Sequence, residues 1–291
     1  FLKPMKKILV PTDFSPLANH ALRTALQLAQ RQKATIRLVH VLHFPLSDEE
    51  TAPGVVEVLP VGYLRQIKQE AKERLQDLIA KEGIMDVPIT PEVRVGNPYQ
   101  SMVRALKKEQ ADLVVMGSKG VTGTREILVG SNAERMIRFS PSPVLIVKGK
   151  TDLSKIKNIV YATALHNKEQ PVLQELSKLQ HAFDAQLHVV RINTINNFME
   201  DPTVREQLKE LAKSSRLENY TLNTFSDIRE EEGIIHFADE VKAELIAIST
   251  HARRGLLHLL GGSVAEDVAN HTKYPVWTMS LQPSSESFVI F

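Results

Sequence analysis

The sequence predicts an α/β protein made of two doubly wound, mostly parallel five-stranded sheets in tandem. Three observations support this fold class. The chain has 291 residues, about twice the commonest domain size. Short apolar runs alternate with longer amphipathic segments, an order typical of parallel sheets covered by helices on both faces. The second half of the chain repeats the first.

The repeat appears when the sequence is aligned with itself. KKILVPTDF at 6–14 matches KNIVYATAL at 157–165, at an offset of 151 residues. ADLVVMGSKGVTGTREILVGSNAE at 111–134 matches AELIAISTHARRGLLHLLGGSVAE at 243–266, at an offset of 132 residues. The first copy is therefore 19 residues longer in its middle, and the excess at 44–62 is rich in proline and is expected to be a long loop.

Strands and helices are predicted in alternation within each copy. In the first copy, strands are expected at the short β-branched runs 8–10, 36–41, 89–95, 113–116 and 144–147. Helices are expected where apolar residues recur at helical spacing, at 16–29, 64–79, 98–106 and 131–139. Ser15 and Asn97 each precede a proline, as an N-cap precedes the first helical residue. Pro91 weakens the third strand because proline cannot donate to a sheet ladder.

The second copy repeats this order of elements. We place the two domains at 1–149 and 150–291, with the linker at 149–152. At about 145 residues, each domain is long enough to bury its own core.

A glycine-rich segment follows the fourth predicted strand, where doubly wound sheets bind ligands. This loop is abnormally long and contains Gly117, Gly120, Gly123 and Gly130, followed by Ser131 and Asn132. Glycines let backbone N–H groups approach a phosphate, and a helix N-terminus adds further donors and a positive dipole end. The spacing is neither that of a P-loop nor that of the dinucleotide fingerprint. The alternative is that these glycines only turn the chain.

Two further features flank this predicted site. Ser131 and Glu134, three residues apart, predict a capping box at the helix that follows the loop. Pro11, Thr12 and Asp13 follow the first strand and place a carboxylate at the mouth of the sheet. Such a carboxylate can accept from an exocyclic amine, hold a metal or interact with the next helix.

Together these features resemble the universal stress protein family, and the chain resembles a tandem member with two such domains. The match rests on ILVPTDFS at 8–15, the strand end His40-Val41, the turn VGNP at 95–98 and the glycines that end in Gly130-Ser131-Asn132. The resemblance implies a Rossmann-like fold, of the adenine nucleotide alpha hydrolase type, that binds ATP and leaves open ADP or AMP, with or without Mg²⁺. It also implies that the fifth strands of the two domains pair within the chain as a pseudo-dimer.

The resemblance assigns roles to individual positions. It implies adenine beside Asp13 and the main chain of Val41, ribose near Met116 and Gly117, and phosphates at the later glycines and the helix start. The candidate nucleotide-binding residues are Pro11, Thr12, Asp13, Val41, Met116, Gly117, Gly120, Gly130, Ser131 and Asn132.

The second copy departs from the family's pattern. Ala164 stands where the first copy has Asp13, and Ser249 and Ala252 stand for Gly117 and Gly120. Gly262, Ser263 and Glu266 are kept, so the helix start is retained. We expect the second domain to bind ATP weakly or not at all.

Composition narrows the classes of function. The absence of cysteine excludes disulfides, thiolate metal sites and cysteine nucleophiles, and the ten histidines show no metal-ligand spacing, so no metal site is expected. The formal net charge of +2 argues against a nucleic-acid-binding protein. No apolar run approaches the ~18 residues of a membrane span, so a cytoplasmic protein without a membrane partner is expected.

The leading functional hypothesis is an ATP-binding stress-response or signalling module whose occupied state is recognised by a protein partner. Phosphoryl transfer needs a positioned base and usually a metal clamp, whereas the motif offers one carboxylate. We therefore expect no catalytic residues and at most slow ATP hydrolysis. The alternative is a nucleotide-independent scaffold. An adenylating enzyme of related fold is disfavoured because PTDFS, and not a glycine-rich loop, follows the first strand.

The assembly follows from the implied pseudo-dimer. The segments at 144–147 and 276–279 are expected to pair, with Trp277 in the core or the interface. Whether two chains form a homodimer stays open, as does the surface that receives the apolar end of the tail SSESFVIF.

Overall fold

The computed structural model of the chain describes residues 4–43, 61–82, 86–118, 129–166, 168–250 and 263–281. The first half contains, in order, β1 (Lys7–Pro11), α1 (Pro16–Gln32), β2 (Thr35–Leu42), α2 (Val61–Glu82), β3 (Ile89–Val95), α3 (Pro98–Glu109), β4 (Leu113–Gly117), α4 (Ser131–Phe139) and β5 (Val144–Val147). The predicted alternation of strands and helices is confirmed.

The second half repeats this order after a short 3₁₀ turn. It contains η1 (Leu153–Lys155), β6 (Asn158–Ala162), α5 (Gln170–Phe183), β7 (Gln186–Asn193), α6 (Asp201–Ser215), β8 (Tyr220–Ser226), α7 (Glu230–Glu240), β9 (Leu245–Thr250), α8 (Val264–His271) and β10 (Val276–Ser280). The duplication extends to strand register, because Ile8 pairs with Leu113 as Ile159 pairs with Leu245.

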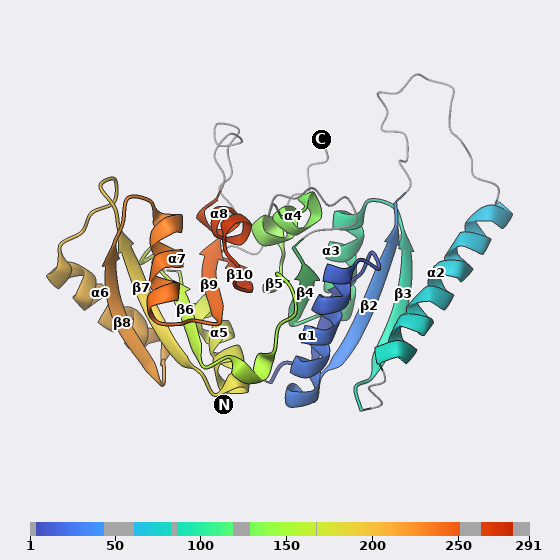
Figure 1. Cartoon of the computed structure of the whole chain (residues 1–291), viewed down its shortest axis with the longest axis horizontal. Coiled ribbons are helices and arrows are strands. Elements are labelled where there is room, and N and C mark those ends of the chain that lie inside the picture. Colours follow the sequence, from blue (N-terminus) through green and yellow to red (C-terminus); the bar gives the residue numbers. More distant parts are fainter. Residues whose placement is uncertain are drawn as a thin grey trace, which may run out of the picture.

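The two five-stranded sheets join into one ten-stranded sheet with the order β3-β2-β1-β4-β5-β10-β9-β6-β7-β8. Strand pairs within each half are parallel, and β5 and β10 pair antiparallel at the centre (Figure 1). In that pairing Trp277 lies opposite Leu145. The predicted pairing of the fifth strands is thus present, and it covers an edge of each half-sheet that would otherwise be open.

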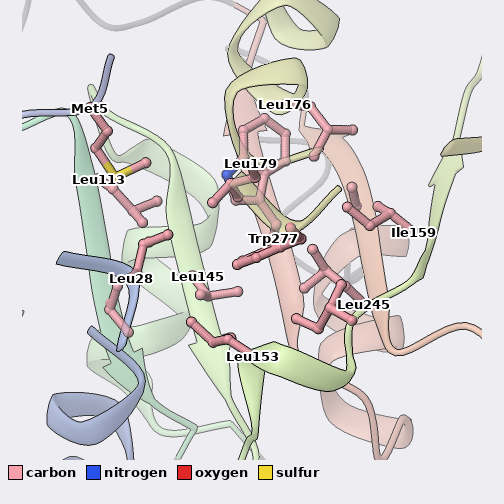
Figure 2. Close-up of a cluster of buried hydrophobic side chains, with 14 of the residues drawn as sticks. Met5, Leu28, Leu113, Leu145, Leu153, Ile159, Leu176, Leu179, Leu245 and Trp277 are labelled. Carbon is pink, nitrogen blue, oxygen red and sulfur yellow. The ribbon is translucent and has the colours of Figure 1, made fainter. Parts of the chain in front are cut away.

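Helices cover both faces of this sheet. The buried residues of α1, α2, α5 and α6 pack on one face, and those of α3, α4, α7 and α8 pack on the other. Successive strand residues alternate between these cores, as Val10 and Leu9 do. Trp277 lies in the first core between side chains of both halves, including Leu145, Leu179 and Leu245 (Figure 2). The prediction that it serves packing is confirmed.

The strand expected at 89–95 is present, and one expectation about a loop changes. Pro91 sits inside β3, where it is tolerated because β3 is an edge strand of the sheet. The loop predicted at 44–62 is too long at its end, because Val61 and Gly62 are the first residues of α2, while 44–60 lie outside the described residues. The tail at 282–291 also lies outside them. Within the described ranges, no helix is both long and apolar enough to cross a membrane.

Candidate functional site

The candidate site lies where the strand order reverses in the first half. β1 pairs with both β2 and β4, and the chain runs outward from β1 through β2 to β3, then returns to β4 and β5. The carboxyl ends of β1 and β4 are therefore neighbours, at Pro11 and Gly117. This is the position at which open α/β sheets bind their ligands.

The turn after β1 is held by local hydrogen bonds. The N–H of Thr12 donates to the carbonyl of Val39 on β2 (2.8 Å), and the hydroxyl of Thr12 accepts from the N–H of Phe14 (3.0 Å). The carboxylate of Asp13 accepts from the N–H of Ser15 (3.0 Å), and Ser15 caps α1 by accepting from Ala18 (3.2 Å). The half-buried Asp13 carboxylate is fixed beyond the carboxyl end of β1, and it keeps lone pairs for a further donor.

Three side chains that the sequence did not single out as ligand-binding surround this turn. His40 Nδ1 donates to the carbonyl of Thr12 (2.8 Å), and its ring lies 4.6 Å from the ring of Phe14. The guanidinium of Arg74, on α2, lies 4.2 Å from the centre of the Phe14 ring, a cation–π contact. Phe14 has a positive φ of 65°. Phe14 and His40 lie in motifs that the sequence shows, whereas Arg74 gave no signal, because α2 reaches this place through tertiary packing.

Gly117 allows β4 to end against the first turn of α1. A Cβ at this position would lie 2.9 Å from the carbonyl carbon of Leu17 and 3.0 Å from its oxygen. Those are backbone atoms, so the contact cannot be relieved by a change of side-chain rotamer. Glycine is therefore required here for packing, which brings the turn holding Asp13 close to the end of β4.

The glycine-rich loop is closed at its base. The N–H of Ser118 donates to the carbonyl of Val147 (3.1 Å), and the N–H of Gly130 donates to the carbonyl of Ser118 (2.7 Å). The two ends of the loop are thus held side by side, and α4 starts next to the end of β4. Gly120, with Gly123, lies at 119–128, outside the described residues.

The capping box predicted at Ser131 and Glu134 is wrong. Gly130 is the N-cap of α4, with extended backbone, and Ser131 is already the first helical residue. The carbonyl of Gly130 accepts from the N–H of Glu134 (3.0 Å), so the helix starts one residue earlier than a Ser131 cap requires. Because glycine has no side chain, the cap position supplies no acceptor to the first N–H groups of α4, and Ser131 is exposed.

The second half keeps the backbone of the turn and changes its chemistry. Thr163 and Leu165 repeat the bonds of Thr12 and Phe14, with the Leu165 N–H donating to the Thr163 hydroxyl (2.8 Å) and a φ of 59°. Ala164 follows Thr163 in place of Asp13. The N–H of His166, equivalent to that of Ser15, instead donates to Glu169 (3.1 Å).

Glu169 is fully buried at the carboxyl end of β6. Its carboxylate also accepts from the hydroxyl of Tyr161 (3.0 Å) and from that of Thr163. Burial and then the Glu169 charge raise the pKa of Tyr161 well above its usual value, so the phenol stays a neutral donor. A carboxylate of the protein thus occupies this end of the strand, and the sequence repeat did not reveal it because Glu169 aligns with Ala18.

The N-terminus of α8 carries the capping box that α4 lacks. Ser263 accepts from the N–H of Glu266 (3.2 Å), and the Glu266 carboxylate accepts from the N–H of Ser263 (3.5 Å). Arg138, on α4, holds the same buried carboxylate through Nε and Nη2, the latter at 2.6 Å. The hydrogen bond to Glu266 raises the pKa of Arg138. This helix N-terminus is therefore already neutralised by the protein's own carboxylate.

The structure brings most of the predicted site residues to one edge of the sheet. Those at the ends of β1, β2 and β4 and at the start of α4 are Pro11, Thr12, Asp13, Val41, Met116, Gly117, Gly130, Ser131 and Asn132. Among the residues that the structure describes, no three His, Asp or Glu side chains are grouped so as to hold a metal ion.

Comparisons of the sequence with family models and with known proteins agree on one family. The model of the universal stress protein family matches residues 4–148 and again 155–279. Universal stress protein MJ0531 of Methanocaldococcus jannaschii is 34% identical over 143 residues, which are 49% of this chain and 82% of that protein.

One solved structure extends the similarity of fold to both halves. A universal stress protein from Archaeoglobus fulgidus has a TM-score of 0.71 at 18% identity, covering 94% of this chain and 96% of that one, which shows a shared fold. A universal stress protein in complex with cAMP covers 44% of this chain and 98% of its own, with a TM-score of 0.38 at 18% identity.

Proposed function

The chain belongs to the universal stress protein family, and we propose that it is an adenine-nucleotide-binding module of stress response or signalling that holds one nucleotide in its first half. ATP is the proposed ligand, with ADP and AMP as competitors and Mg²⁺ as a companion of the phosphates. In this proposal the second half has a structural or regulatory role.

The observation that carries this proposal is the contrast between two equivalent helix N-termini. At α4 the cap is Gly130, which has no side chain. At α8 the cap is Ser263, and the buried Glu266 carboxylate lies over the first turn with Arg138 as its counterion. A phosphate is attracted by a helix N-terminus whose cap has no side-chain acceptor, and it is repelled by one whose cap is bonded to a buried carboxylate.

The chemistry at the end of β1 supports the same choice. Asp13 is half-buried and has lone pairs left after its bond to Ser15, so it suits an exocyclic amine. In the second half, Ala164 offers no acceptor, and Glu169 is fully buried and bonded to three donors of its own half. Charge agrees with this, because residues 1–149 hold 21 Lys and Arg against 15 Asp and Glu, whereas 150–291 hold 15 against 19.

We propose that the protein binds ATP and does not hydrolyse it rapidly. Asp13 is engaged with the turn that follows β1, and in-line phosphoryl transfer needs a base positioned at the terminal phosphate. A turnover comparable with dedicated ATPases, measured as phosphate release, would contradict this part of the proposal.

Titration calorimetry tests the proposal. The protein is freed of co-purified nucleotide and titrated with ATP and Mg²⁺, and then with ADP and AMP. We expect about one nucleotide per chain, with binding lost in Asp13→Ala and Gly130→Leu. The matched control is Gly262→Leu, at the equivalent position of the second copy, which should bind like the wild type. If no adenine nucleotide binds to the wild type, the nucleotide-independent scaffold becomes the better account.

A further inference from the structure

One hydrogen bond links the second half of the chain to the base of the glycine-rich loop in the first half. The side-chain oxygen of Asn270, on α8, accepts from the backbone N–H of Val129 (2.7 Å). Val129 is buried and directly precedes Gly130, the N-cap of α4. Two successive N–H groups are therefore held, that of Gly130 by Ser118 and that of Val129 by the other half of the molecule.

Further contacts join the two halves around α4 and α8. Lys148, which follows β5, donates to the carbonyl of Ala269, the neighbour of Asn270. The hydroxyl of Thr250 donates to the carbonyl of Ile137 on α4 (3.2 Å). α4 and α8 lie side by side above the paired strands β5 and β10 (Figure 1). Asn270 thus lies on a helix that packs against α4 of the other half.

The repeat shows that position 270 is specialised. Asn270 is equivalent to Arg138, at the offset of 132 residues. Each of the two side chains crosses to the other half and reaches the start of the other helix, but Arg138 binds a carboxylate whereas Asn270 binds a backbone N–H. Arginine has no acceptor, so it could not replace Asn270 in this contact.

We propose that Asn270 is a positioning residue of the second half for the phosphate-binding segment of the first half. By holding Val129, it orients Gly130, Ser131 and Asn132, and so it couples nucleotide affinity to the contact between the halves. The ligand part of this inference rests on the proposed function. Because coupling is reciprocal, a bound nucleotide in turn strengthens the contact between α4 and α8 and makes the state of this contact readable by a partner.

The test compares Asn270→Leu with Thr250→Val. Both variants remove one polar contact between the halves and nearly preserve side-chain size, but only Asn270 touches the loop base. We expect Asn270→Leu to weaken ATP binding by about fivefold, the effect of one lost hydrogen bond to a buried N–H. Thr250→Val should bind ATP like the wild type. Equal losses in the two variants, or no loss in Asn270→Leu, would overturn the inference.

Amide hydrogen exchange without nucleotide separates this inference from the proposed function. Exchange in a peptide covering 129–135 should be faster in Asn270→Leu than in the wild type and in Thr250→Val. Asn270→Asp keeps an acceptor and should retain slow exchange, which also guards against a general loss of folding. If the wild type binds no nucleotide, the proposed function fails while this comparison still decides the positioning role. Unchanged exchange in Asn270→Leu refutes it.

Discussion

Asp13 and Glu169 bond equivalent backbone N–H groups in the two halves, although they do not align in the sequence. Asp13 accepts from Ser15, and Glu169 accepts from His166, 151 residues further along. The two carboxylates differ in surroundings, since Asp13 is half-buried and accepts this one bond. Glu169 is fully buried and accepts from three donors, two of which are hydroxyls. One carboxylate is available to a ligand, and the other serves the stability of the fold.

This difference predicts opposite effects of two similar substitutions. Glu169→Ala leaves the hydroxyls of Tyr161 and Thr163 without their acceptor inside the core, so it should lower the free energy of unfolding by about 2–4 kcal/mol. Asp13→Ala should lower it by less than about 1 kcal/mol while removing ATP binding. Urea denaturation followed by circular dichroism measures both values. Equal destabilisation by the two changes would contradict the assignment of roles.

The same substitution, glycine to alanine, should have different effects on stability at Gly117 and at Gly62. Gly117→Ala places a methyl group against the backbone of Leu17, so α1 must shift, at a cost of about 1–3 kcal/mol. Gly62→Ala, at the second residue of α2, meets no atom within 4 Å and should change the stability by less than about 0.5 kcal/mol. Thermal unfolding of the two variants tests this. A neutral Gly117→Ala would show that the close approach of α1 is not required.

The interface between the halves depends on Trp277, the single tryptophan of the chain. Its side chain is 1% exposed and lies between residues of both halves (Figure 2). Trp277→Ala should therefore cost about 3–5 kcal/mol of unfolding free energy. In the wild type, the emission of this tryptophan should resist quenching by acrylamide. Strong quenching in the folded protein would contradict a packed interface.

His236 and Asp227 predict a dependence of stability on pH. The hydrogen bond to Asp227 (2.7 Å), followed by its charge, raises the pKa of the exposed His236 above 6.5. A raised pKa in the folded state means that the contribution is complete below about pH 6.5 and is lost as the pH rises through the folded value. The stability difference between the wild type and His236→Gln should therefore be larger at pH 5.5 than at pH 8.5. A stability difference that grows with pH would contradict a raised pKa of His236 in the folded protein.

Much of the fold follows from local sequence patterns, and the exceptions have physical causes. The strand at 89–95 and the helices after Ser15 and Asn97 are found where apolar spacing and capping residues predict them. The capping box at Ser131 was wrong because Gly130 can act as a cap with its backbone alone, so motif spacing did not fix the helix start. The resemblance to a known family supplied the pairing of the fifth strands, which local patterns do not contain.

The candidate site was only partly predictable. Asp13 and the glycines lie in recognisable motifs, but the contact between Asn270 and Val129 joins residues 141 positions apart and depends on the pairing of the halves. Glu169 reaches its position because α5 starts at Gln170, three residues later than the start of α1 implies at the offset of 151 residues. An alignment of the two copies cannot show that a residue at one position has taken the structural place of a residue at another.

The central claim, that the first half alone holds the nucleotide, is tested most directly by hydrogen exchange of the full chain with and without saturating ATP and Mg²⁺. The account predicts slower exchange in peptides that cover 11–18 and 129–135. It predicts no change in a peptide that covers 162–169, the segment equivalent to 11–18 at the offset of 151 residues. Protection of the peptide that covers 162–169, equal to that of 11–18, would contradict it.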